Sequence, residues 1–238
     1  KLNFVSIFSS NLDEFFMVRV ASLRDMVHAD YKKADIAGMT ATEQLEKINV
    51  ATRELVELQY STYNRSLVPQ LEAKGIRIID AFEELTAEQQ EFVDKYFEET
   101  VYPVLTPMAV DASRPFPLIR NKTLNIAAFL LKKGEKKKEE NYEFATVQVP
   151  GVLPRIIPIP DGENHSFILL EQIIEKNMER LFLNYDVICA YPYRIMRNAD
   201  LTIDEDEAED LLQEIQKQLK KRQWGEIIRL EVEDKIDK

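Results

Sequence analysis

The residues with the clearest capacity for chemistry lie close to the N-terminus, where a short polar run precedes an apolar-periodic segment. Asn11 carries an amide that is both a hydrogen-bond donor and an acceptor, which suits the edge of a purine base. Asparagine is also a good helix N-cap, and Glu14, three residues later, can complete a capping box. Spacing alone favours the N-cap interpretation, but a polar helix start is also a place where a nucleotide can dock.

Arg19 is the second candidate, because it falls on a helix face that we expect to be buried. Phe15, Phe16 and Leu23 flank it on that face at helical spacing. A buried guanidinium needs a partner, since an unpaired charge is costly to desolvate. The partner is either a carboxylate such as Asp13, in a structural ion pair, or a bound phosphate, and the sequence leaves both open.

Motifs that would assign a catalyst or a cofactor are absent from the sequence. It contains no glycine-rich phosphate loop, no HExxH, no CxxC and no nucleophile elbow. His28 and His165 are far apart in sequence and favour surface or packing roles, and Cys189 lies in an apolar run that favours a buried, inert thiol. The acidic run 204–207 fits a helix start better than a metal cluster. We therefore expect no catalytic residue and no metal site in this chain.

Length and charge limit the class of protein. The 238 residues suffice for one large domain or two modest ones, and 45% hydrophobic with 31% charged residues is ordinary for a soluble globular chain. A net charge of -11 argues against a chain whose main task is to bind nucleic acid or an anionic membrane. No apolar run is long enough to form a transmembrane segment, no signal peptide is present, and the single cysteine fits a reducing compartment.

The first hundred residues carry helix signals almost throughout. Capping boxes begin at Thr40 and Thr86, Pro69 should kink or shorten its helix, and Gly75 supplies a stop. The expected elements are a helix over 4–29 with a break near Ser9 and Ser10, a helix over 40–74, a short extended piece over 76–79, and a helix from 86 to just before Pro103.

Prolines and strand-like runs replace these helix signals after residue 103, and the order of elements there predicts an α+β domain. The sequence therefore predicts the α+β fold class, with a helical N-terminal domain over 1–105 and an α+β domain over 106–238, joined between 103 and 114. The expected strands cover 125–131, 144–149, 155–159, 166–170, 186–193 (or on to 196) and 227–232, and the expected helices cover 170–183 and 204–223.

The run Ser9-Ser10-Asn11-Leu12-Asp13-Glu14-Phe15, followed by Val18-Arg19, resembles the N-terminal domain of bacterial polyphosphate kinase of the first, histidine-phosphorylating type. Separate blocks in the second half resemble the head domain of that family, and the match runs in order over nearly the whole chain. Two positions depart from the family pattern, Arg114 in place of a histidine and Asn198 in place of an aspartate. The blocks are 114–118, 123–127, 144–150, 153–155, 197–212 and 228–233.

This resemblance implies an enzyme, an ATP:polyphosphate phosphotransferase. Such an enzyme moves the terminal phosphate of ATP to a protein histidine and then, reversibly, to inorganic polyphosphate. Asn11 matches the asparagine that contacts the ATP base in this family, and the head domain, here 106–238, takes part in dimerisation. The resemblance thus implies ATP as substrate with Mg²⁺ in the full-length enzyme, and ATP, ADP, polyphosphate and a second copy of the chain as partners.

The resemblance also implies that this chain is a fragment. The histidine that becomes phosphorylated, with the arginines and the metal site around it, belongs to later domains. We therefore expect the chain to be inactive alone and to hold no cofactor. The implied location is the cytoplasm, including peripheral sites at the inner face of the membrane. The alternative from another class is a non-catalytic protein-interaction module without a nucleotide role.

Overall fold

The computed structural model describes residues 1–110, 116–138, 141–162, 164–199, 225–234 and 236. The chain groups into two compact units, each built from separated stretches of sequence. The helical unit comprises Lys1–Pro69, Arg120–Lys122 and Ile195–Leu230, and the sheet unit comprises Gln70–Ile119, Thr123–Arg194 and Glu231–Lys238. The helix expected over 204–223 lies outside the described residues.

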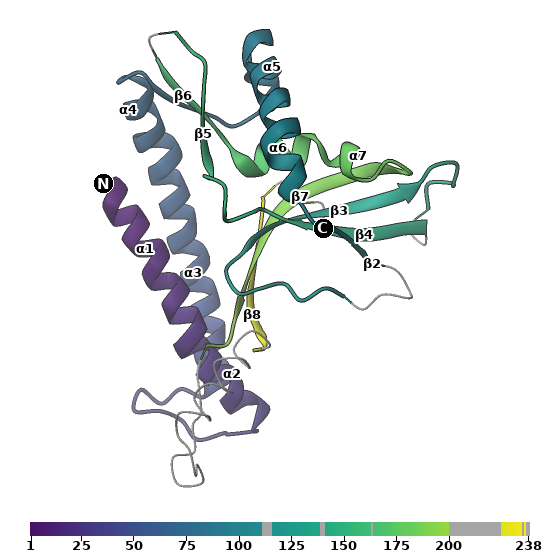
Figure 1. The fold of residues 1–238 in the computed structure, drawn as a ribbon. Coiled ribbons are helices and arrows are strands. Elements are labelled where there is room, and N and C mark those ends of the chain that lie inside the picture. Colours follow the sequence, from purple (N-terminus) through teal and green to yellow (C-terminus); the bar gives the residue numbers. More distant parts are fainter. Residues whose placement is uncertain (111–115, 139–140, 163, 200–224, 235, 237–238) are drawn as a thin grey trace, which may run out of the picture. The chain divides into compact units, whose positions relative to one another are not determined.

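The helical unit begins with one long helix in three parts, namely α1 (Leu2–Phe15), a π-helical turn (Phe16–Val20) and α2 (Ala21–His28) (Figure 1). The expected break at Ser9 and Ser10 is wrong, and so is the N-cap interpretation of Asn11, because the helix runs through all three positions. The hydroxyl oxygen of Ser9 accepts a hydrogen bond from Nε2 of Gln59 at 2.5 Å. A tertiary contact therefore engages a polar group that the sequence had suggested for a helix start.

The second long helix begins at the predicted capping box, which is confirmed. Oγ1 of Thr40 accepts a hydrogen bond from the Glu43 N–H at 3.3 Å, and the Glu43 carboxylate accepts one from the Thr40 N–H at 2.7 Å. The hydrogen bonds that the backbone and side chain of Thr40 donate lower the pKa of Glu43 from its ordinary value. The helix consists of α3 (Ala41–Thr62), a π-helical turn (Tyr63–Leu67) and α4 (Val68–Glu72).

Pro69 coincides with a change in the hydrogen bonding of this helix. Proline has no N–H to donate to the carbonyl group four residues back. The π-helical turn lies immediately before it, and there the Val68 N–H bonds to the Tyr63 carbonyl oxygen, five residues back. The chain then leaves the helix through Gly75, whose φ of +74° lies in the left-handed region that glycine adopts without strain.

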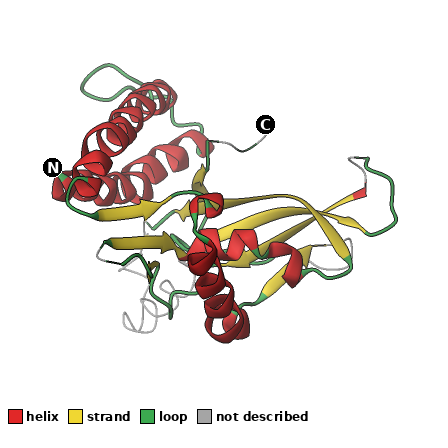
Figure 2. Ribbon diagram, turned by 90° about the horizontal axis from the view of Figure 1, so that it is seen from above, coloured by secondary structure: helices red, strands yellow, loops and turns green. Residues whose placement is uncertain are grey.

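The strands form two sheets, drawn in yellow in Figure 2. The strands are β1 (Ile76–Ile79), β2 (Pro107–Val110), β3 (Leu124–Lys132), β4 (Tyr142–Gln148), β5 (Ile156–Ile159), β6 (His165–Leu169), β7 (Tyr185–Arg197) and β8 (Ile227–Val232). One sheet has the order β1-β6-β5, with β1 parallel and β5 antiparallel to β6. The other has the order β2-β4-β3-β7-β8, and β4 and β7 both pair antiparallel with β3.

The helices of the sheet unit include the second predicted capping box, which is also confirmed. Oγ1 of Thr86 accepts from the Gln89 N–H at 3.3 Å, and Oε1 of Gln89 accepts from the Thr86 N–H at 3.0 Å. The helical segments are a 3₁₀ turn (Phe82–Glu84), α5 (Ala87–Tyr96), a π-helical turn (Phe97–Val101), a 3₁₀ turn (Tyr102–Val104), α6 (Leu170–Lys176) and α7 (Met178–Leu181).

An apolar core joins these helices to the sheets. Its largest contributors are side chains with no exposed area, among them Val93, Phe97, Ile126, Leu130 and Ile168. They come from α5 and its π-helical turn, from β3 and from β6. Because burying one such side chain stabilises a fold by roughly 1.5–3 kcal/mol, this core is what orders the sheet unit.

The predicted α+β class is confirmed, since N-terminal helices are followed by sheets. Sequence analysis missed β2, which is short and starts at Pro107. The predicted division into 1–105 and 106–238 differs from the two units, because β1 pairs with β6. As a division into functional domains it stays a prediction. None of the helices that the structure describes is long and apolar enough to cross a membrane.

The carboxylate of Glu171, in the first turn of α6, provides a test of this packing. Only 7% of its side chain is exposed, and Nε of Arg155 donates to its Oε1 at 2.9 Å. Arg155→Met leaves the carboxylate buried without that cation, so we expect the free energy of unfolding to fall by about 2 kcal/mol. The control Arg77→Met breaks the half-exposed pair with Glu84 and should cost less than about 1 kcal/mol. Urea denaturation measures both, and equal costs would contradict this account.

Candidate functional site

Asn11 lies in the interior of α1, and its side chain is exposed. Asparagine is a weak helix former at such a position, because its amide competes for backbone hydrogen bonds. Within the part of the chain that the structure describes, no hydrogen bond engages this amide. Helix stability therefore does not account for an asparagine here, and its donor and acceptor are available to a ligand.

The π-helical turn after α1 brings Asn11 and Arg19 onto one face of the helix. Two α-helical turns hold about seven residues, whereas one α turn followed by one π turn holds about eight. Arg19 therefore returns to the direction of Asn11, with Phe15, 39% exposed, between them. We call these three exposed side chains, Asn11, Phe15 and Arg19, the Asn11 face.

The expectation that Arg19 is buried is wrong, and the same turn explains why. In an uninterrupted α-helix this residue would point about 80° away from Asn11, toward the apolar side. Its guanidinium is instead exposed, and Nη2 donates a hydrogen bond to Oε1 of Gln44 on α3 at 3.3 Å. Asp13, which we considered as its ion-pair partner, has Oδ2 at 3.3 Å from Nζ of Lys122.

An apolar cluster fixes the helix that carries the Asn11 face. Phe16 and Val20 in the π-helical turn, with Ala21 after it, are buried against Met196 and Ile228. The last two come from the end of β7 and the start of β8, far along the chain. The cluster therefore holds the helix through buried residues that alternate along the sequence with the exposed Phe15 and Arg19.

A second anchor is the turn Arg120–Lys122, which sequence analysis missed. Nδ2 of Asn121 donates a hydrogen bond to Sδ of Met17 at 3.3 Å. Its Oδ1 accepts one from the Arg197 N–H at 2.9 Å. No local sequence signal marks Asn121, because each partner is far away along the chain.

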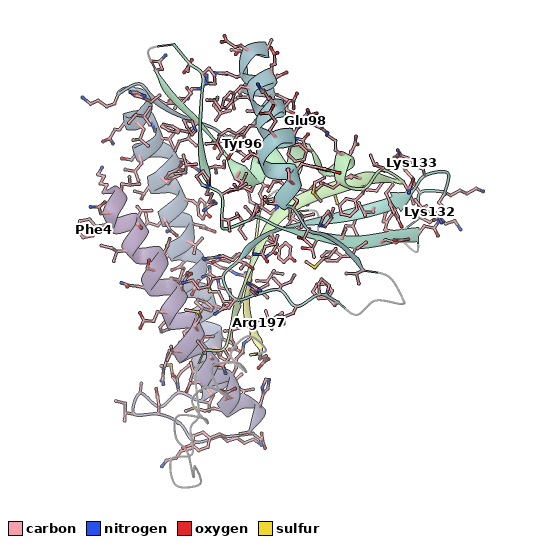
Figure 3. All side chains as sticks on the ribbon, viewed as in Figure 1. Phe4, Tyr96, Glu98, Lys132, Lys133 and Arg197 are labelled. Atoms are coloured by element: carbon pink, nitrogen blue, oxygen red, sulfur yellow. The ribbon has the colours of Figure 1, made fainter. Side chains whose placement is uncertain are left out.

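Arg197, labelled in Figure 3, is a buried arginine whose contacts are structural. Its Nη1 donates a hydrogen bond to the Gly225 carbonyl oxygen at 2.8 Å. Burial lowers the pKa of Arg197 from its ordinary value, because desolvation disfavours the charged form. The residue thus ties the end of β7 to the segment that leads into β8.

Three groups near the end of α2 could hold a metal ion. Asp25, His28 and Glu226 place ligand atoms within 4.8 Å of one another, and all three residues are exposed. Nη1 of Arg24 lies 3.9 Å from the Glu226 carboxylate, and Nδ2 of Asn198 donates to that of Asp25 at 3.2 Å. Because a cation and an amide already contact these carboxylates, an ion-pair cluster is the better interpretation, and we assign no metal to it.

Two families match the chain in order. The polyphosphate kinase N-terminal domain matches residues 1–79, and the polyphosphate kinase middle domain matches residues 88–238. Over 98% of its length the chain is 49% identical to a polyphosphate kinase of Bacillus anthracis, and over 100% it is 49% identical to one of Lactiplantibacillus plantarum. These alignments cover 33% and 32% of the two relatives, so the chain spans about a third of their length.

The fold is similar to a solved structure as well. The crystal structure of polyphosphate kinase from Porphyromonas gingivalis superposes with a TM-score of 0.72 at 26% sequence identity. The similarity covers 91% of this chain and 33% of that one. The described architecture is therefore similar to a part of that solved protein.

Asn11→Ala tests whether Asn11 supports the helix. Because the residue lies inside α1 and caps nothing, we expect alanine to raise the free energy of unfolding of the helical unit by about 0.5 kcal/mol. Asn49→Ala, at an exposed interior position of α3, is the matched control and should give a similar gain. Thermal or urea unfolding measures both. A loss of about 1 kcal/mol from Asn11→Ala alone would restore the N-cap interpretation.

Proposed function

The chain belongs to the polyphosphate kinase family, and from that premise we propose that it forms about a third of an ATP:polyphosphate phosphotransferase. Enzymes of phosphoryl transfer act largely by positioning the nucleotide and by stabilising the transferred group electrostatically. We assign to this chain the part of that task that positions the nucleotide. The first acceptor is a histidine outside it, whose ring nitrogen bonds to phosphorus as ADP leaves. A terminal oxygen of polyphosphate then takes the phosphoryl group, reversibly.

The exposed amide of Asn11 is the observation that carries this assignment. Asparagine can bind adenine through two hydrogen bonds, one donated to a ring nitrogen and one accepted from the exocyclic amino group. The position is otherwise unfavourable for asparagine, since it lies in the interior of α1 and caps nothing. We infer that Asn11 contacts the base of ATP.

The rest of the Asn11 face fits the same ligand. Arg19 lies about 12 Å along the helix axis from Asn11, a separation suited to the distance between the base and the phosphates of one nucleotide. A guanidinium can donate two parallel hydrogen bonds to a phosphate. The hydrogen bond to Gln44 holds this guanidinium on the exposed side of α1. Arg19 therefore serves as a phosphate contact in this proposal.

Family membership supports three finer parts of the proposal. Mg²⁺ accompanies ATP in the full-length enzyme, with its ligands outside this chain. The head domain, residues 106–238, takes part in a homodimer. The enzyme works in the cytoplasm, where ATP and ADP are its small-molecule partners.

Exposed apolar side chains on α1 favour a second candidate function, a module that acts through protein contacts alone. Phe4, labelled in Figure 3, is 77% exposed, and Leu2 and Ile7 are 51% and 53% exposed. Exposed apolar side chains mark interaction sites where they form a contiguous surface. This candidate predicts that changes on the Asn11 face leave ATP use unaffected.

Asn11→Ala in the full-length protein should weaken ATP use while leaving the protein folded. Each loss of 1.4 kcal/mol in binding raises the ATP requirement about tenfold, so we expect KM for ATP to rise about tenfold with little change in kcat. Steady-state kinetics at saturating polyphosphate provide the measurement. Asn49→Ala is the matched control and should retain the wild-type KM.

Asn11→Asp sharpens this test. Aspartate has nearly the same shape, but it lacks the amide donor and adds a negative charge beside a polyanionic ligand. We expect a larger rise in KM for ATP than Asn11→Ala produces. Normal ATP kinetics in Asn11→Asp would reject a donor role for this amide and would favour the interaction module.

The chain of residues 1–238 alone should remain unlabelled when it is incubated with Mg²⁺ and ATP that carries a radioactive terminal phosphate. The reason is that the family resemblance places the phosphorylated histidine in later domains, and both His28 and His165 are exposed surface residues. Autoradiography after gel electrophoresis provides the readout. Acid-labile label on either histidine would contradict the placement of the phosphorylated histidine outside this chain.

A further inference from the structure

Asp13 is a carboxylate buried close to the proposed base contact. It follows Asn11 by two positions on α1, and it is 6% exposed. A carboxylate in such a place needs compensation for the water it has lost. Nζ of Lys122 supplies it, at 3.3 Å from Oδ2 of Asp13.

Lys122 reaches Asp13 from a backbone conformation that lysine disfavours. Its φ is +63°, in the left-handed region where glycine or asparagine is less strained. The Lys122 N–H donates to the Ile195 carbonyl oxygen at 2.9 Å, which holds the turn in this shape. A glycine would relieve the strain but would remove the cation, so the side chain accounts for a lysine at this position.

The same turn contacts the helix at a second point. Asn121 donates a hydrogen bond to Sδ of Met17 at 3.3 Å. Asp13 and Met17 are four residues apart, so the two contacts lie about one turn apart on the helix. Two contacts spaced in this way oppose both rotation of the helix about its axis and sliding along it. They fix the helix at Asp13 and Met17, the first of which is two residues after Asn11.

We propose that Asp13 and Lys122 form a positioning pair that sets the direction of the Asn11 amide toward the base of ATP. This inference rests on the proposed function. Asp13 lies two residues from Asn11 in sequence, the pair is partly buried, and Lys122 belongs to a turn from a distant part of the chain. A displacement of about 1 Å is enough to weaken a positioned contact. Neither residue needs to touch the nucleotide, so both act through Asn11.

The test is the double variant Asp13→Asn with Lys122→Met in the full-length protein, because it removes both charges and leaves no buried charge behind. We expect an unfolding midpoint close to that of the wild type, KM for ATP raised about fivefold, and kcat within about twofold. If the pair only stabilises the fold, a double variant with the stability of the wild type should also have the wild-type KM for ATP. The conservative variant Lys122→Arg keeps the cation and should retain the wild-type KM. If the double variant is unstable, Asp13→Asn alone provides the same KM comparison.

Adding Asn11→Ala to the double variant separates this inference from the proposed function. If the pair acts through Asn11, the triple variant should show the KM of Asn11→Ala alone, since coupled residues are not additive. A stable double variant with a normal KM overturns the positioning pair and leaves the base contact standing. The positioning pair is also overturned if the rise in KM in the triple variant equals the product of the rises in the double variant and in Asn11→Ala, because the pair then acts independently of Asn11. A normal KM in Asn11→Ala overturns the base contact and this inference together.

Discussion

Burial of Phe16 and Val20 against Met196 and Ile228 is the interaction on which the helical unit depends. In folded proteins most of the stability of a helix comes from tertiary packing of its apolar face and not from helix propensity. The partners, Met196 and Ile228, come from the far end of the described chain, so a helix near the N-terminus depends on packing against residues distant in sequence. The exposed face that carries Asn11 is positioned by this anchor.

The packing also explains why exposed polar residues such as Asn11 can occupy the other side of the same helix. A helix held by one apolar face and by the Asp13–Lys122 pair does not need its exposed residues for stability. Those positions are therefore free to carry residues chosen for chemistry, such as an asparagine in the helix interior. The cost in helix propensity is a few tenths of a kcal/mol, which is small beside the burial of one large apolar side chain.

Local signals in the sequence predicted local structure well. The capping boxes at Thr40 and Thr86 marked two helix starts, because the groups that satisfy each other there lie within three residues. At Asn11 the same capping signal gave a wrong prediction, because the helix continues through this residue and does not begin there. The burial of Arg19 was mispredicted because a period of 3.6 residues does not foresee a π-helical turn. Lys122 had no local signal, because Asp13 lies more than a hundred residues away.

Asn198 is a position where the family resemblance and the structure together explain the residue type. Its amide, where the family resemblance leads one to expect a carboxylate, donates to Asp25 at 3.2 Å and so avoids two facing negative charges.

The described residues contain π-helical turns at Phe16–Val20, Tyr63–Leu67 and Phe97–Val101. A π turn holds about one residue more than an α turn, so it accommodates an extra residue while the helix segments on its two sides keep about the same relative direction. The first of these turns lies between the exposed Asn11 and the buried Ala21. Removing a single residue there would leave an α turn that still completes one rotation, so Asn11 and the residues after the turn would keep about the same relative direction. The turn therefore absorbs a one-residue difference in chain length without turning Asn11 away from its side of the helix, and a sequence comparison that closes a one-residue gap there would pair Asn11 with the wrong position.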